Sequence, residues 1–372
     1  MNIVFLTRHD PTNINSWSGT LYHIYHKLKE NHTIEVIGTE ILKQLVSFRK
    51  GNFPEDISIQ NDQCFKNLGR LLSERINALE YDLVFWGDLI FIPSDINIPF
   101  FLLSDMTFEQ TNIHYDKPDE RDVETYYNLE RFLLNTATRI IFCSEWIKQK
   151  AIDFYNVDMN KIDVVEFGAN ILIPTNYTID IDMDVCRLVF IGLDWERKRG
   201  DAVLQTYQIL KKQNFPCTLT IIGSTPKGIQ DEDANLTIIP FLDKSKKDDL
   251  EKFSTILSES HFLILPTRFD AFGIVFCEAS AYALPSITAD VGGVNQAVKE
   301  GKNGFLLPPD ASASDYAENI ISVFNDKEYY LKLRASTRYE FETRLNWEVW
   351  GEKVNKIVKD AVSEWELQKK SE

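Results

Sequence analysis

The chain has 372 residues, of which 44% are hydrophobic and 26% are charged. This length exceeds one ordinary hydrophobic core and is sufficient for two domains. The formal net charge of −16 argues against a nucleic-acid partner, because a phosphate backbone needs a basic face, and against strong adsorption to anionic lipid. No apolar run is long enough to span a bilayer, so we expect no transmembrane helix.

The amino-terminal segment and the cysteines indicate the expected compartment. Residues 1–10, MNIVFLTRHD, lack a basic segment and a cleavage site, so we expect a first strand and not a signal peptide. The five cysteines are scattered without metal-type spacing, mostly in apolar runs, which predicts reduced core residues. We therefore expect a cytoplasmic protein with at most peripheral contact at the inner face of a membrane. Residues 40–53 are a candidate surface amphipathic helix, with a packed helix as the alternative.

Short apolar runs alternate with longer amphipathic segments along the whole chain. The predicted strands are residues 2–7, 33–38, 81–87, 99–104 and 139–144 in the first half, and 187–192, 217–223, 236–241, 261–266 and 285–289 in the second half. Continuous apolar runs of this length are typical of strands that are buried on both faces. The pattern predicts an α/β fold with two doubly wound Rossmann-like domains and a ligand site at the carboxyl ends of the strands.

The polar and acidic segment 174–184, PTNYTIDIDMD, predicts an interdomain linker. We therefore place an N-terminal domain at residues 1–173 and a C-terminal domain at residues 178–346. The aspartates of this segment are spaced like a DxD metal motif, but nothing places them at the carboxyl end of a strand, so a solvated linker is the favoured interpretation. Residues 347–372 predict a long amphipathic helix whose apolar stripe needs a large surface on which to pack.

The segment 268–286, RFDAFGIVFCEASAYALPS, places two acids in an almost entirely apolar stretch. A buried carboxylate is costly unless a charged or hydrogen-bonding group meets it, so Asp270 and Glu278 indicate a ligand with hydroxyl groups. Gly273 lies where we expect a helix to begin, and the free N–H groups of a helix N-terminus bind phosphate. The alternative is that Asp270 caps the helix and Glu278 is solvated.

The segment 190–201, FIGLDWERKRGD, has a strand, a loop with three cations, and then a helix. Arg197 and Lys198 are suited to neutralising a departing diphosphate. The alternative is an exposed basic loop. Another basic run, KSKK at 244–247, is interpreted as solvated surface.

Two first-half segments are weaker candidates. Gly19 lies near a helix start and permits a close approach of the backbone to phosphate, with a simple cap by Ser18 as the alternative. Asp105 follows a strand end and is a candidate acceptor of a hydrogen bond from a substrate hydroxyl, with a capping role as the alternative. The sequence has no G-x-S-x-G, no P-loop and no G-x-G-x-x-G after the first strand, which argues against serine hydrolysis and hydride transfer.

Together these motifs resemble the retaining GT-B glycosyltransferases of family 4. The segment DAFGIVFCEASAYALP, followed by DVGGVNQAVKEGKNGFLLPP, resembles that family's E-x7-E acidic pair, Gly-Gly turn and NG strand entry. FIGLDWERKRGD is similar to its diphosphate loop and SWSGT to its N-terminal glycine loop. The chain departs from the pattern at Asp270, where the family has Glu, at Leu193, where it has Arg, and at Arg199, where it has Gly.

The resemblance implies a role for each matching residue of the second domain. Glu278 would bind the nucleotide ribose and Asp270 the hydroxyls of the donor sugar, while Arg197 and Lys198 would stabilise the leaving diphosphate. Pro240 and Phe241 would border the base. The backbone N–H groups expected to contact sugar and phosphate are those of Phe272, Gly273, Ile274 and Val275.

In the first domain, the resemblance implies that Gly19 approaches the diphosphate and that the tail helix returns onto this acceptor-side domain. Asp105 lies near the place of a cleft histidine in many relatives, and we assign it provisionally to the catalytic group.

The implied activity is the transfer of a hexose-type sugar, with retention and without a metal or other cofactor. The donor would be a nucleotide diphosphate sugar, with a UDP-sugar favoured and GDP-mannose next. The acceptor would be a glycan, a glycolipid or another hydroxyl compound. Two alternatives stay open: a GT-B nucleotide-sugar epimerase, and a non-catalytic GT-B partner protein.

Overall fold

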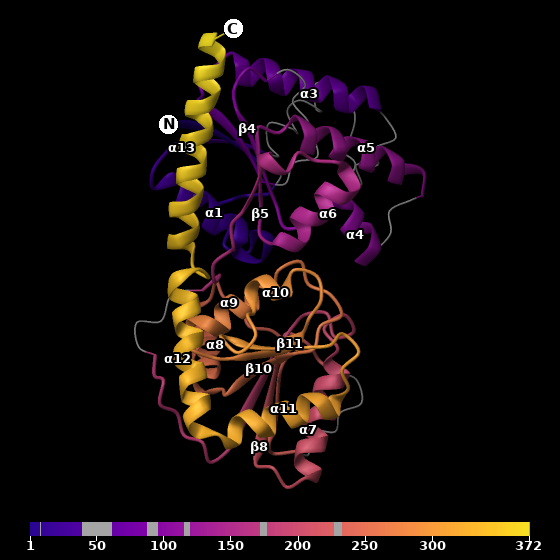
Figure 1. Cartoon of the computed structure of the whole chain (residues 1–372), viewed down its shortest axis with the longest axis vertical. Coiled ribbons are helices and arrows are strands. Elements are labelled where there is room, and N and C mark those ends of the chain that lie inside the picture. Colours follow the sequence, from indigo (N-terminus) through magenta and orange to yellow (C-terminus); the bar gives the residue numbers. More distant parts are fainter. Residues whose placement is uncertain are drawn as a thin grey trace. The chain divides into compact units, whose positions relative to one another are not determined.

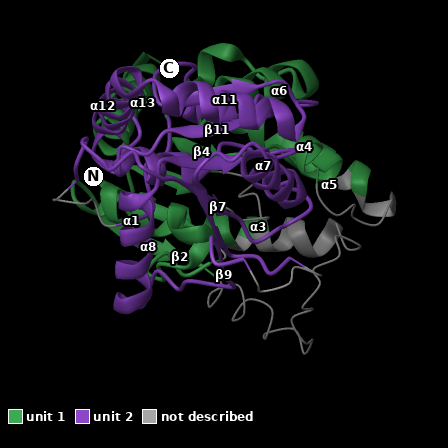
Figure 2. Ribbon diagram, turned by 90° about the horizontal axis from the view of Figure 1, so that it is seen from below, with its two compact units in different colours: residues 1–165, 350–372 green, residues 166–349 purple. Residues whose placement is uncertain are grey.

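The computed structural model describes residues 1–7, 9–38, 62–87, 96–114, 120–171, 177–226 and 233–371. The chain divides into two compact units, coloured separately in Figure 2. Unit 1 contains residues 1–165 and 350–372, and unit 2 contains residues 166–349. The division falls before the expected linker at 174–184, because residues that follow the division already pack within unit 2. For example, Phe167 contacts the rings of Phe272 and Trp347.

Unit 1 is built on a six-stranded parallel sheet in the order β2-β1-β3-β4-β5-β6. Its strands are β1 (Asn2–Leu6), β2 (Thr33–Ile37), β3 (Leu83–Trp86), β4 (Phe100–Ser104), β5 (Arg139–Phe142) and β6 (Ile162–Val164). Its helices are α1 (Thr20–Lys29), α3 (Asp62–Asn77), α4 (Phe108–His114), α5 (Glu120–Thr136), α6 (Glu145–Tyr155) and most of α13 (Trp347–Ser371), with 3₁₀ turns η1 (Ser16–Gly19) and η2 (Met159–Lys161). Figure 1 shows these elements in sequence colours.

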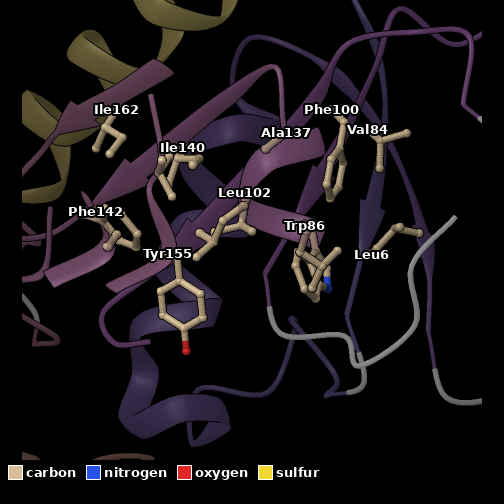
Figure 3. Close-up of a cluster of buried hydrophobic side chains, with 14 of the residues drawn as sticks. Leu6, Val84, Trp86, Phe100, Leu102, Ala137, Ile140, Phe142, Tyr155 and Ile162 are labelled. Carbon is tan, nitrogen blue, oxygen red and sulfur yellow. The ribbon is translucent and has the colours of Figure 1, made fainter. Parts of the chain in front are cut away.

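The four inner strands of unit 1, β1, β3, β4 and β5, are apolar and mostly buried, as expected where both faces of a sheet are covered. Figure 3 shows one hydrophobic cluster of this unit, which includes Val84, Phe100, Leu102 and Ile140 of the sheet and Tyr155 of α6. The tail helix α13 contributes to the same unit, because its Trp350 and Val354 are completely buried. The apolar stripe expected for residues 347–372 is therefore present.

Unit 2 contains a second six-stranded parallel sheet in the order β12-β11-β10-β7-β8-β9. Its strands are β7 (Cys186–Ile191), β8 (Cys217–Ile222), β9 (Leu236–Ile239), β10 (Phe262–Leu265), β11 (Ser286–Ala289) and β12 (Gly304–Leu307). Its helices are α7 (Gly200–Lys212), α8 (Lys247–Glu259), α9 (Ile274–Ala281), α10 (Val294–Ala297), α11 (Ala313–Asn325) and α12 (Lys327–Thr343).

The strand order of unit 2 reverses between β7 and β10, its first and fourth strands along the chain. In open α/β sheets, ligands bind at such a switch point, outside the carboxyl ends of the strands. The loops that follow β7 and β10 are therefore the parts of unit 2 best placed to bind a ligand.

All ten expected strands are present, within two residues at each end, and the predicted α/β fold class is confirmed. Strand β6, which has only three residues, was not predicted, and β12 was anticipated only as the NG strand entry, without bounds. No helix among the described residues is long and apolar enough to cross a membrane. The candidate amphipathic helix at 40–53 lies outside the described residues.

The backbone of the acidic linker segment is held by a buried arginine of α12. The completely buried guanidinium of Arg334 donates hydrogen bonds to the carbonyl oxygens of Thr178 and Ile179. The side chain of Asp182 is 64% exposed. Among the described residues, no group of three or more His, Cys, Asp or Glu side chains is arranged to hold a metal ion.

Candidate functional site

The loops at the switch point of unit 2 are joined to each other by hydrogen bonds. The first, residues 192–199, connects β7 to α7, and the second, residues 266–273, connects β10 to α9. The N–H of Arg268 donates to the carbonyl of Arg197 at 2.7 Å. In return, Nη1 of Arg197 donates to the carbonyl of Phe269 at 2.9 Å. Segments 72 positions apart in the sequence thus form one surface.

This junction holds a cluster of two cations and a carboxylate. Nζ of Lys198 lies 2.5 Å from Oδ1 and 2.6 Å from Oδ2 of Asp270, and Nη1 of Arg197 lies 3.4 Å from Oδ1. The side chains of Lys198 and Asp270 are only 11% and 12% exposed. Burial lowers the pKa of Lys198, and the adjacent Asp270 carboxylate opposes that shift. The structure therefore brings together three of the four residues predicted as catalytic.

Arg199, which stands where the family has Gly, adopts the backbone conformation that favours Gly, with φ of 52°. A non-glycine residue there costs about 1–2 kcal/mol. Its guanidinium donates to the carbonyls of Pro309 and Ala311 at 3.2 Å each. These two hydrogen bonds offset the backbone strain at Arg199, the residue that directly precedes α7.

Helix α9 begins directly after Gly273, whose φ is 87°. A Cβ atom at Gly273 would lie 2.5 Å from the ring of Phe276, so no other residue fits without a shift. No side chain caps this helix, so the alternative interpretation of Asp270 as a cap is wrong. The first N–H groups of a helix have no partner within it, so contact of those near Ile274 and Val275 with sugar and phosphate stays a prediction. Phe272 itself is buried.

The Gly-Gly turn at 292–293 supports the backbone of Asp270. The N–H of Gly293 donates to the carbonyl of Asp270 at 3.0 Å. Gly292 has φ of 55°, and a Cβ atom there would lie 2.3 Å from that same carbonyl oxygen. The turn therefore needs glycine because it fits directly against the acidic loop.

Glu278 is not solvated, as the alternative interpretation had it, because its side chain is 3% exposed. Its Oε1 forms an ion pair with Nζ of Lys244, and the carboxylate also accepts the backbone N–H of Asn170. Burial raises the pKa of Glu278, while Lys244 and the Asn170 bond act in the opposite direction. The sequence analysis missed both partners. The 244–247 run was interpreted as solvated surface, although it begins only three positions after Phe241, a predicted base-binding residue.

Phe241 and Pro240 come directly after β9 at the carboxyl end of the same sheet. Both are exposed, Phe241 to 61%. Leu193, which stands where the family has Arg, is 73% exposed at the end of β7. An exposed aromatic ring beside strand ends is available for stacking on a flat ligand, so the predicted contact with a base stays a prediction.

The candidates of unit 1 lie together within that unit. Trp17, Ser18 and Gly19 have successive positive φ values of 50°, 54° and 94°. Helix α1 starts after Gly19 without a side-chain cap, so the alternative role of Ser18 as its cap is wrong. Asp105 follows β4 and accepts a hydrogen bond from the Trp17 side chain, and burial raises the pKa of Asp105 to about 6.

This contact gives Asp105 a structural role in holding the 16–19 turn. Its assignment to the catalytic group stays a prediction, as does the approach of Gly19 to a diphosphate.

Comparisons show which known proteins this chain resembles. The family model described as glycosyl transferases group 1 matches residues 180–340, which include every site residue of unit 2 apart from Asn170. Over this region, which is less than half of the chain, the chain is similar to the glycosyl transferases group 1 family. The capsular polysaccharide biosynthesis glycosyltransferase CapM of Staphylococcus aureus is 26% identical over 255 residues, covering 63% of this chain and 66% of CapM. Alignments with the next relatives cover less of those proteins.

Solved structures agree on the fold. A glycosyltransferase from Rickettsia africae has a TM-score of 0.69 at 16% identity, covering 97% of this chain and 98% of that one. HepE from Anabaena, solved in complex with UDP, has a TM-score of 0.66 at 14% identity, covering 97% of this chain and all of that one (100%). These structures confirm the predicted GT-B fold, and the family model and CapM bear out the predicted resemblance to glycosyltransferase enzymes.

Proposed function

We propose that this protein transfers a sugar from a nucleotide diphosphate sugar to a hydroxyl acceptor, with retention of the anomeric configuration and without a metal ion. The observation that carries the proposal is the cluster of Lys198, Arg197 and Asp270 at the switch point of unit 2, beside the N-terminus of α9. Fixed cations and a helix dipole are suited to the negative charge that develops on a leaving diphosphate.

In this structure, the Asp270 carboxylate forms ion pairs with both Lys198 and Arg197. A diphosphate offers more negative charge than one carboxylate, so it would compete with Asp270 for the Lys198 ammonium and the Arg197 guanidinium. That exchange would leave Asp270 oxygens available to accept hydroxyls of the donor sugar. The cluster would thereby hold its charges in place before the donor binds, which is the preorganisation that electrostatic catalysis needs.

The proposed reaction balances without a strong protein base. The acceptor oxygen forms a bond to the anomeric carbon, and the bond from that carbon to the phosphate oxygen breaks. The bonding electrons leave with the diphosphate, on the side where Lys198 and Arg197 stabilise them. The proton of the acceptor hydroxyl passes to a phosphate oxygen.

We favour a UDP-sugar as donor and GDP-mannose next. HepE has been solved with UDP and with UDP-glucose, and its fold is shared by this chain. Glu278 would accept the ribose hydroxyls, and the exposed ring of Phe241 would border the base. For the acceptor, we favour a glycan or a lipid-linked glycan, in keeping with the name of CapM.

A non-catalytic GT-B partner protein is the second candidate, and the exposed Leu193 in place of an Arg favours it. Against it, Arg197 supplies a guanidinium to the same loop junction, where it donates to the carbonyl of Phe269. Donor binding without turnover would support this candidate over the transferase.

The test is thermal shift and diphosphate release with a panel of UDP- and GDP-sugars, each with and without EDTA. Wild type is compared with Glu278→Ala and with Glu251→Ala, a control on α8 whose side chain is 67% exposed. We expect one donor to raise the melting temperature and to release diphosphate despite EDTA. Both effects should be lost in Glu278→Ala and kept in Glu251→Ala. Loss of turnover with EDTA would refute metal independence, and inversion at the anomeric carbon, followed by NMR, would refute retention.

A further inference from the structure

Lys244 lies in the loop between β9 and α8, and its side chain turns back toward α9. Its ammonium pairs with Glu278 and lies 4.8 Å from the centre of the Phe253 ring. A cation in this position over an aromatic face is attracted to it, so the ring helps to hold the side chain. Lys244 is still 29% exposed, so its ammonium group is not sealed from solvent.

The neighbouring lysines behave differently. Lys246 and Lys247 are 71% and 85% exposed, and they pair with Asp243 and Glu251 near the surface. Exposed pairs of that kind contribute little to stability. Lys244 is distinguished within this run because its partner, Glu278, is almost completely buried.

The hydrogen-bonding capacity of Glu278 suits a pair of hydroxyl groups. An ionised carboxylate offers about four lone-pair positions. Lys244 and the N–H of Asn170 each use one, which leaves two acceptor positions for the adjacent hydroxyls of a ribose. Without a cation nearby, a carboxylate this deeply buried would favour its neutral form, which accepts hydrogen bonds less strongly.

We infer that Lys244 is a positioning residue of the nucleotide site, which holds the Glu278 carboxylate ionised and oriented so that it accepts both hydroxyls of the ribose. This inference rests on the proposed function, because it presupposes that Glu278 binds the nucleotide of the donor. It adds that recognition of ribose over 2′-deoxyribose depends on a lysine outside the acidic segment.

The test is calorimetric titration with UDP, GDP and their 2′-deoxy counterparts, using whichever base binds to the wild type. We expect the wild type to bind the ribonucleotide more tightly than the deoxynucleotide. Lys244→Met should bind the ribonucleotide about tenfold more weakly and lose most of the preference for ribose, because a charge-assisted hydrogen bond is lost. Lys244→Arg should recover a large part of the preference, and Lys247→Met should match the wild type.

A double-mutant cycle separates positioning from a general structural role. If Lys244 acts through Glu278, the double variant Lys244→Met/Glu278→Gln should bind the same ribonucleotide no more weakly than Glu278→Gln alone. The cycle also covers the case in which Lys244→Met folds poorly, because Glu278→Gln removes the uncompensated charge. Melting temperatures without ligand show whether each variant is folded.

The outcomes distinguish this inference from the proposed function. If the wild type binds none of the nucleotides, the proposed function fails and the inference fails with it. If the wild type binds but Lys244→Met keeps affinity and ribose preference, the inference alone is overturned. It is also overturned if Lys244→Met binds more tightly, because Lys244 would then compete with the ribose, or if the two substitutions are additive.

Discussion

Replacing Lys198 by Met would remove one partner of the buried pair with Asp270. Loss of one partner of a buried ion pair costs about 3–5 kcal/mol, because a charge is left uncompensated. Here Nη1 of Arg197 stays 3.4 Å from Oδ1 of Asp270, so part of the compensation persists. We therefore expect Lys198→Met to lower the free energy of unfolding by about 2–3 kcal/mol. In a domain of this size, that corresponds to a fall in melting temperature of about 5–10 °C.

The assay is a thermal melt of the full chain together with diphosphate release from the preferred donor. Turnover should fall about 10²–10³-fold, as when one group that stabilises a developing anion is removed. The matched control is Lys211→Met, because Lys211 pairs with Asp233 at 2.7 Å but is 42% exposed, so its loss should cost less than about 1 kcal/mol.

A second variant tests the electrostatic reasoning directly. Adding Asp270→Leu to Lys198→Met removes both buried charges, so stability should recover while activity does not. The reasoning is refuted if Lys198→Met melts and turns over like Lys211→Met, or if Asp270→Leu lowers the stability of Lys198→Met further.

Three further substitutions test the backbone and the buried acids. Gly292→Ala should lower the free energy of unfolding by more than about 2 kcal/mol, because its Cβ would lie 2.3 Å from the carbonyl oxygen of Asp270. The control is Gly301→Ala, where φ is 68° and the nearest atom is 4.0 Å away, and we expect a loss of about 1 kcal/mol there. Equal losses in thermal melts of the two variants would contradict the steric argument. Arg199→Gly should lower the melting temperature, because the loss of two hydrogen bonds from a guanidinium outweighs the relief of about 1–2 kcal/mol of backbone strain. A rise in melting temperature would show that the strain is the larger effect. In α5, burial raises the pKa of Glu130 from 4.5 to about 7. The stabilisation from its protonated form is therefore complete below pH 4.5 and is lost as the pH rises through 7. In urea titrations over that range, the stability of the wild type relative to Glu130→Gln should fall, and a rise would refute the assignment.

The sequence predicted the two sheets and most of the unit 2 site because both depend on local patterns. A continuous apolar run specifies a strand buried on both faces, whatever its neighbours are. Gly273 and Gly292 mark positive φ values, which few other residues adopt without cost. Strand β6 was missed, because its three residues give a weak periodic signal.

Local sequence determined that this protein has two doubly wound units, an acidic segment after β10 and a cationic loop after β7. It did not determine which charges meet. Lys198 pairs with Asp270, 72 positions away in the sequence, and Lys244 pairs with Glu278, 34 positions away. In contrast, Lys246 and Lys247, close to Lys244, are mostly exposed to solvent. Only the tertiary structure decided these pairings, because the cost of burying a charge depends on the groups that the folded chain brings beside it.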